Sequence, residues 1–251
     1  MERPLMPRIH RERILLVGGQ RALVMQLAHP KVAAAVAEHS DFPNGALRRL
    51  RRTLDLTLAT VFGTAVEASA ATERIRAVHR RVSGTGEGGP YTATDPLLLL
   101  WVNATLIDTT LVTYERFVRP LAEADRAAYY RETLAWTEDF GIPTDLVPAD
   151  LDGFRAYLAG MLSGPELRAT AAGRELVASV LRPPLPFPLR AATEGVRLVT
   201  LALLPTPILR MFGLRAGVRV RAALAAATAA SRATLPFLPP VVREFSAARR
   251  S

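Results

Sequence analysis

Cysteine is absent from this chain of 251 residues. Without a thiol the protein cannot form disulfides, iron–sulfur clusters or thiolate–metal bonds, and it has no cysteine nucleophile. The absence is compatible with a reducing compartment, and we expect a cytoplasmic protein. Histidine, with four occurrences, therefore becomes the first residue type to examine for a cofactor site.

Lysine is almost absent as well, since Lys31 is the only one. The formal net charge of +9 is therefore carried by arginine. Basic chains often bind nucleic acid or anionic membranes. Here the arginines are scattered through stretches rich in alanine and leucine, with no interleaved aromatic residues, which favours solvated helix surfaces. We expect no nucleic-acid partner.

Long uninterrupted apolar runs are also missing. The most apolar region near the C-terminus, residues 196–214, contains Arg197, Pro205, Pro207 and Arg210. A spanning helix needs about 20 mostly apolar residues, and charge inside it is costly. The charged N-terminus does not resemble a signal peptide. We expect no targeting segment and a membrane contact that is at most peripheral.

Signature motifs for several common activities are lacking too. The sequence contains no phosphate-binding loop, zincin motif, nucleophile elbow or calcium loop. Gly18 and Gly19 lack the third spaced glycine of a dinucleotide loop, and no alternation of strands and helices follows them. A dinucleotide-binding fold is therefore excluded.

Helical periodicity is what the sequence does contain, almost from end to end. We predict an all-α, single multi-helix domain with a central buried helix and a haem-sized cavity. The segment 83–90 is rich in glycine and is expected to be a loop, and no sheet of more than two short strands is expected. The expected helices cover residues 21–28, 32–38, 46–62, 66–82, 97–117, 123–138, 151–162, 166–181, 189–204, 208–214 and 216–234.

The helix expected over residues 97–117 is apolar nearly all round, which indicates a buried central position. Thr94 or Asp95 can cap it, and Pro96 suits its first position. We expect Trp101 and Leu111 to be nearly inaccessible. The whole chain is expected to form one domain, with a core of about residues 12–182 and a C-terminal helical extension of about residues 189–240.

His79 is the most interesting of the four histidines. On a helix it shares a face with Ile75, Val78 and Val82. A neutral imidazole among apolar side chains is a good iron ligand, although a core histidine satisfied by hydrogen bonds gives the same pattern. His10 lies in a charged N-terminal stretch, where we expect no dry cofactor site. His29 and His39 are expected to brace helix ends.

Arg49, Arg52 and Thr53 share one face of the helix expected over residues 46–62, at spacings of three and four. Two guanidinium groups and a hydroxyl can hold a haem propionate, a bound oxygen species or an acidic substrate. A solvated basic face is the alternative. Glu38 and Glu67 are weaker candidates for a base.

Several stretches together resemble the MpaB and latex-clearing (rubber) oxygenase family. They are GGQRALVMQLAHPKVAAAVAEHSDF from Gly18, RLRRTLDLTLATVFGT from Arg49, IRAVHRRVSG from Ile75, YTATDPLLLLWVNATLIDTTLVTYERF from Tyr91 and, more weakly, YYRETLAWTEDFGIPTDLVP from Tyr129. Each stretch alone matches the family pattern only weakly, but the ordered set of stretches is fairly specific to the family. The resemblance covers most of residues 12–160.

This resemblance implies an all-α fold and a haem b whose iron is held by one histidine, with oxidative chemistry on apolar, isoprenoid-type substrates. The family's axial histidine follows an arginine by three residues, a pattern matched by Arg76 and His79. Its polar distal helix matches Arg49, Arg52 and Thr53. The resemblance thus implies His79 as the metal ligand, Arg76 and Arg49 as cofactor-binding residues, and Arg49, Arg52 and Thr53 as catalytic residues.

Two positions depart from the family pattern. Asn103 stands where many members have histidine, and Arg52 stands where the rubber-cleaving branch often has lysine. An arginine cannot replace a lysine that ligates iron, so rubber itself is an unlikely substrate. We expect an enzyme, a haem-dependent oxygenase acting with dioxygen on an apolar, alkene-containing small molecule. The alternatives are a non-catalytic haem-binding sensor or carrier and a cofactor-free helical interaction or membrane-peripheral protein.

Overall fold

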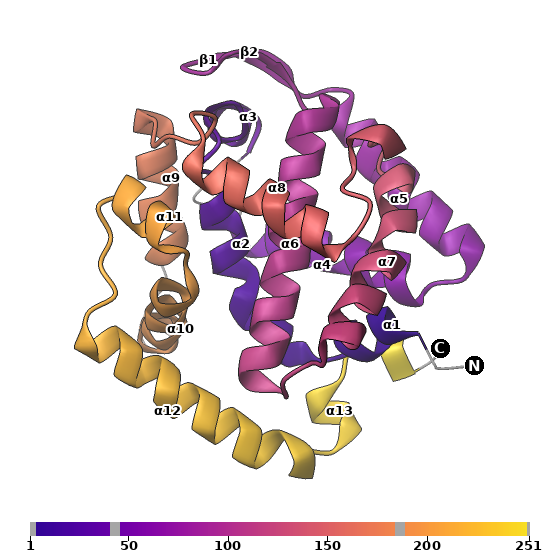
Figure 1. Ribbon diagram of the computed structural model, residues 1–251, viewed down its shortest axis with the longest axis vertical. Coiled ribbons are helices and arrows are strands. Elements are labelled where there is room, and N and C mark those ends of the chain that lie inside the picture. Colours follow the sequence, from indigo (N-terminus) through magenta and orange to yellow (C-terminus); the bar gives the residue numbers. More distant parts are fainter. Residues whose placement is uncertain (1–3, 41–45, 184–188, 250–251) are drawn as a thin grey trace.

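The computed structural model describes residues 4–40, 46–183 and 189–249, with side chains described for 4–40, 54–183 and 193–249 (Figure 1). Helices dominate it, as predicted. In the N-terminal half they are α1 (Leu5–His10), the 3-10 helix η1 (Arg13–Gly18), α2 (Gly19–Gln26), α3 (Pro30–His39), α4 (Ala46–Phe62), α5 (Ala65–His79) and α6 (Pro96–Phe117). In the C-terminal half they are α7 (Glu123–Asp139), η2 (Thr144–Leu146), α8 (Leu151–Ser163), α9 (Ala171–Leu181), α10 (Leu189–Leu203), α11 (Thr206–Met211), α12 (Val218–Thr234), η3 (Leu235–Phe237), α13 (Pro240–Arg243) and η4 (Ala247–Arg249).

Helix α6 runs through the middle of the molecule (Figure 1). Asp95 caps its start by accepting a hydrogen bond from the amide of Leu97, with Pro96 at the first helical position. Trp101 and Leu111 are buried, which confirms the prediction of a central helix. Among the described helices, α6 alone is long and apolar enough to cross a membrane, and 56% of its most apolar window is buried inside the protein. That burial is typical of a core helix.

The segment that carries Gly18 packs very closely against α6. A Cβ atom placed on Gly18 would lie 2.7 Å from the Cγ2 atom of Thr109 and would also collide with the hydroxyl of Thr113. No larger residue fits there without movement of the backbone. A 3-10 helix, η1, precedes this glycine instead of a strand, which agrees with the exclusion of a dinucleotide loop.

Arg21 of α2 joins three helices from inside the protein. Its side chain is 3% exposed and donates to Asp108 Oδ2 at 2.6 Å, to Thr109 Oγ1 at 2.6 Å and to the carbonyl of Leu203 at 2.9 Å. Asp108 and Thr109 belong to α6, whereas Leu203 ends α10. The buried guanidinium therefore ties the C-terminal helices to the core.

The C-terminal extension packs on the same core as the N-terminal helices. Helix α12 lies against α10 and α6, and the hydroxyl of Ser231 donates to the carbonyl of Phe117 at 2.9 Å. A small hydrophobic cluster of Phe117, Val199 and Leu203 closes the contact. The chain forms a single domain, as predicted.

The glycine-rich segment after α5 is a β-hairpin and not an irregular loop, so that detail of the prediction was wrong. Strands β1 (Ser83–Gly86) and β2 (Gly89–Thr92) pair antiparallel, and the positive φ of Gly89 (+85°) allows the tight turn. Tyr91 donates to Glu38, and Nε2 of His39 lies 3.1 Å from the carbonyl oxygen of Ser83, which fixes the hairpin on α3. These two short strands make the only sheet in the described part of the chain.

The short helix α1, which the sequence analysis did not anticipate, is docked on α7. Glu132 accepts hydrogen bonds from the free amides of Leu5 and Met6, at 2.8 and 2.6 Å. At the other end, Nε2 of His10 lies 2.9 Å from the hydroxyl of Tyr129. The imidazole also packs against Trp136. Because α1 folds back onto α7, His10 is half-buried against Tyr129 and Trp136, whereas the expectation that it holds no cofactor stays a prediction.

We expect replacement of Arg21 by methionine to lower the free energy of unfolding by about 3 kcal/mol, because Asp108 loses its partner in a largely buried setting. Chemical denaturation of wild type and variant measures this loss. Arg155→Met removes an exposed ion pair with Glu123 and is expected to cost much less, because solvent screens that pair. Equal losses in the two variants would contradict a special role for Arg21.

Burial lowers the pKa of His10 from 6.5 to about 4. The unfolded chain therefore binds the proton more readily, so the stability contributed by neutral His10 is complete above about pH 6.5 and is lost as the pH falls toward 4. At about 1.4 kcal/mol per pKa unit, the loss by pH 4 is about 3 kcal/mol. Denaturation curves across this range should show that drop for wild type relative to His10→Gln, whose amide does not titrate. Identical pH profiles would contradict it.

Candidate functional site

Helix α5 carries the candidate ligand at its C-terminal end. The helix begins with a capping box, in which the amide of Glu67 donates to Thr64 Oγ1 and Glu67 Oε2 accepts from the amide of Thr64 at 2.8 Å. Glu67 is thus engaged at a helix start, twelve residues before His79, and is a poor candidate for a base. His79 is the last helical residue.

The imidazole of His79 is half-buried, and this loss of solvation lowers its pKa below the ordinary 6.5. At neutral pH the ring is therefore uncharged, which is the form that binds a metal. Ala71 and Thr72 on the same side of α5 are buried, and Ile75 is half-buried. Val78, which the sequence analysis placed on this apolar face, is 48% exposed, because α5 packs chiefly on one neighbour, α4, and buries only a narrow face.

His79 differs from the other three histidines in its hydrogen bonding. His10 is bonded to Tyr129, His39 to the carbonyl of Ser83, and Nδ1 of His29 accepts from the amide of Lys31 and so caps α3. This confirms that His29 and His39 brace helix ends. Within the described part of the chain, His79 has no hydrogen-bond partner on its ring. A half-buried imidazole with both nitrogens available has the property that a ligand requires.

Thr72 adds a second unsatisfied group on the same side of α5. Its hydroxyl is buried and makes no hydrogen bond to any described residue. Thr72 and His79 are seven residues apart, close to two helical turns, so both lie on one face. Thr72 was not among the residues proposed from the sequence, because spacing alone does not show that its hydroxyl lacks a partner. The unpartnered hydroxyl thus lies about two helical turns before the free imidazole, on the same face of α5.

Helix α4 supplies apolar surface next to α5. Its described side chains that are apolar and half-buried are Leu54, Leu56, Leu58, Ala59, Val61 and Phe62. No described side chain of α4 or α5 belongs to either hydrophobic cluster of the core or packs against them. The pair α4–α5 therefore has apolar surface that the core does not use, a suitable setting for an apolar cofactor.

Arg49, Arg52 and Thr53 lie in the first half of α4, and their side chains are outside the described residues. Their proposed roles therefore stay predictions. Arg76, three residues before His79, is exposed, and its guanidinium lies over Gly141 at the end of α7, where an added Cβ would be 3.3 Å from Nη2. The helix C-terminus with its free carbonyls is a favourable place for this charge.

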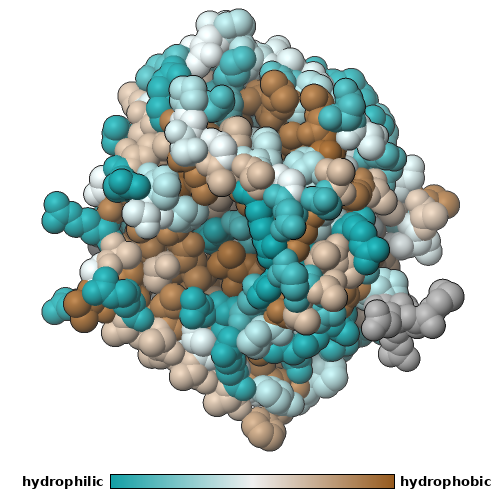
Figure 2. Space-filling model, in the orientation of Figure 1, coloured by the Kyte–Doolittle hydropathy of each residue, from teal (hydrophilic) through white to brown (hydrophobic). Residues whose placement is uncertain are grey.

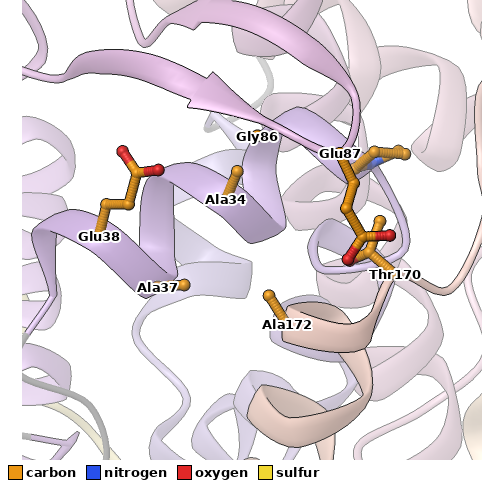
Figure 3. Close-up of a pocket in the computed structure, with 8 residues that line it drawn as sticks. Ala34, Ala37, Glu38, Gly86, Glu87, Thr170 and Ala172 are labelled. Carbon is orange, nitrogen blue, oxygen red and sulfur yellow. The ribbon is translucent and has the colours of Figure 1, made fainter.

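A cavity of about 210 Å³ lies elsewhere in the protein, between α3, the hairpin turn and the start of α9 (Figure 3). Its lining residues are Pro30, Ala34, Ala37, Glu38, Gly86, Glu87, Thr170 and Ala172. Glu38, the other base candidate, belongs to this cavity and accepts a hydrogen bond from Tyr91, which together with burial raises the pKa of Tyr91 to about 12. The volume is below the roughly 300 Å³ at which ligand pockets begin.

Protein side chains alone do not form a metal centre among the described residues. No three histidine, aspartate or glutamate side chains there gather closely enough to hold an ion. Zinc and similar ions bound directly by protein normally need three or four such ligands. Haem iron needs only one, because the porphyrin supplies the equatorial nitrogens. The lone, free His79 therefore fits a haem better than a bare ion.

Comparison with known proteins identifies the family of the chain. The family model described as "ER-bound oxygenase mpaB/B'/Rubber oxygenase, catalytic domain" matches residues 7–233. Two relatives, "Uncharacterized protein Mb2261" of Mycobacterium bovis and "Uncharacterized protein Rv2237" of Mycobacterium tuberculosis, are each 31% identical over 178 residues. The alignments cover 67% of this chain and 68% of each relative. No solved structure gives a significant match.

The matched range runs from α1 nearly to the end of α12 and so includes α4, α5 and α6. It contains every residue that the sequence analysis proposed for the site. The all-helical fold described above is the one that the resemblance implied. The chain therefore belongs to the family of mpaB and rubber oxygenase catalytic domains.

Proposed function

We propose that this protein is a haem b-dependent oxygenase that acts on an apolar, alkene-containing small molecule, with His79 as the iron ligand. The observation that carries the proposal is the free, uncharged imidazole of His79 beside apolar surface that the hydrophobic core leaves unused. The family's description as oxygenases supports the reaction type. Bound haem would supply an iron atom at which dioxygen is activated for attack on a double bond.

The residues around His79 have separate roles in this proposal. Desolvation keeps the imidazole of His79 unprotonated, so that one ring nitrogen is available to iron. The unpartnered hydroxyl of Thr72 provides a hydrogen bond to the cofactor or to a water beside it. Arg49, Arg52 and Thr53 on α4 would hold a haem propionate or stabilise negative charge that develops during the reaction, as the family pattern suggests. Arg76, at the edge of α5, offers a second cation for a propionate.

The substrate side of the proposal depends on α6. Most of this helix is buried, but Leu99, Val102 and Leu106 form a less buried strip along one side. Side chains of this kind can serve as an apolar wall for a substrate. Asn103 lies on the same strip and is half-buried. The amide of Asn103 can hydrogen-bond but is a poor iron ligand, so Asn103 does not compete with His79 for the iron.

Replacing His79 by alanine is expected to abolish haem binding. Purified apoprotein is titrated with haemin, and the Soret absorption and the iron content after gel filtration are measured. Wild type should bind one equivalent, whereas the variant should show no specific Soret shift, because the iron loses its only protein ligand. His29→Asn and His39→Gln are matched controls that keep the helix-end hydrogen bonds and should bind haem normally.

Loss of the Soret band in a His29 or His39 variant, with retention in His79→Ala, would show that the wrong histidine was chosen. A wild-type protein that takes up no haem would favour a cofactor-free interaction protein. A holoprotein that binds haem but consumes no dioxygen with isoprenoid alkenes would favour a sensor or carrier. Thr72→Val tests the second group, and we expect weaker haem binding with an unchanged fold, since the two side chains have nearly the same shape.

A further inference from the structure

Positive charge is concentrated in one segment near the C-terminus. Residues 195–243 contain seven arginines and no acidic residue, so about a fifth of the chain supplies seven of the nine net positive charges. Arg197 pairs with Glu194, and Arg243 pairs with Glu12. The other five are exposed and form no salt bridge with any described residue: Arg210, Arg215, Arg219, Arg221 and Arg232.

Helix α12 presents an exposed apolar strip between these arginines. At 3.6 residues per turn, the strip starts at Val218, which is 73% exposed. It continues through exposed alanines at positions 222, 225, 226, 229 and 233. Arg219 falls on one edge of the strip, and Arg221 and Arg232 fall on the other. The last two donate only to backbone carbonyls, which leaves their charge uncompensated.

Larger apolar side chains extend this surface past the end of α12. Phe237 is 86% exposed, and Val241 and Val242 are each about half exposed. Four prolines, at positions 236, 239, 240 and 205, stiffen the C-terminal segments, three of them around Phe237. We call the α12 strip together with Phe237, Val241 and Val242 the C-terminal ridge. Figure 1 shows α12 and α13 together along the outer edge of the molecule.

The space-filling view agrees with this description. Along the lower edge in Figure 2, which α12 occupies in Figure 1, hydrophobic residues reach the surface. A folded protein seldom exposes several apolar side chains in one segment without a function for them. An apolar strip with cationic side chains on both edges is the pattern of a helix that lies in a membrane interface.

We propose that the C-terminal ridge binds the surface of an anionic lipid bilayer, with Phe237, Val241 and Val242 inserted among the acyl chains. Arg219, Arg221 and Arg232, which flank the strip on α12, face the lipid phosphates, since the ridge contains no acidic residue to oppose them. The ridge lies in the C-terminal segment, whereas the proposed haem ligand is on α5. The two proposals therefore stand on different residues, and membrane binding is measured without turnover.

Charge decides against the other possible occupants. A two-fold dimer through this ridge would bring six uncompensated arginines, three from each copy, onto one interface, where like charges repel. Nucleic acid would pair with the arginines but would leave the apolar strip and Phe237 in water. A bilayer with anionic headgroups satisfies both the charge and the apolar surface.

The experiment is sedimentation of the full chain with vesicles, with and without added haemin. We expect binding to phosphatidylcholine vesicles that contain about one third phosphatidylserine, weaker binding to phosphatidylcholine alone, and a decrease as salt is raised. Phe237→Ser combined with Val241→Ser should lower the bound-to-free ratio roughly tenfold. Arg219→Glu combined with Arg221→Glu should lower it by about the same factor on anionic vesicles only.

Matched controls carry the same changes elsewhere on the surface. Val66→Ser removes an exposed apolar side chain from α5, and Arg131→Glu reverses an exposed arginine on α7. Both should bind vesicles as wild type does. Thermal unfolding checks that all variants remain folded, which the exposure of the changed residues leads us to expect.

Three results would overturn the proposal. The first is full recovery of the wild-type protein in the supernatant with anionic vesicles, and the second is a loss of binding in the control variants as large as in the ridge variants. The third is a dimer, seen by light scattering, that the Phe237 and Val241 changes convert to monomer, in which case a second copy covers the ridge. Because haemin is present in one arm only, none of these results depends on whether the protein binds haem.

Discussion

The buried guanidinium of Arg21 is the interaction on which the rest of the architecture depends. It satisfies Asp108 and Thr109 on α6 and the end of α10 at once, in a region from which water is nearly excluded. An unpaired charge there would be costly, so the three helices can only assemble together. The close approach permitted by Gly18 holds η1 and α2 at the distance that the ion pair needs. The GGQR segment is therefore a packing motif, with no role in binding a nucleotide.

This arrangement divides the molecule into a tightly packed core and a pair of helices with spare apolar surface. The core gathers around α6, whereas the described parts of α4 and α5 contribute to neither hydrophobic cluster. A cofactor that completes such a region gains binding energy from surface that folding alone did not bury. The unpartnered groups of His79 and Thr72 lie on one side of α5. Stability and the proposed cofactor binding would thus depend on different helices.

Local sequence signals predicted the elements well but their surroundings less well. The cap at Asp95, the end of α4 before Gly63 and the burial of Trp101 follow from short-range chemistry and were predicted correctly. The packing of His10 on α7 was missed, because it depends on Tyr129, more than a hundred residues away. The exposure of Val78 was missed because helical periodicity shows which side chains share a face but not how much of that face is buried. Thr72 was not predicted, because an unsatisfied hydroxyl can be recognised only when the positions of the neighbouring side chains are known.

The positions of the arginines along the chain are more informative than the total net charge. Spread evenly, a net charge of +9 would indicate only a soluble basic protein. Arginines such as Arg126 and Arg155 are instead neutralised by acidic partners. The C-terminal ridge contains no acidic residue that could do the same. An enzyme with an apolar substrate meets that substrate mostly in lipid, since partition into acyl chains removes it from water. A cationic ridge that includes Phe237 would keep the protein at the lipid surface, where such a substrate collects. The clustering of unpaired arginines and the proposed chemistry of α5 thus support each other, although they involve different residues.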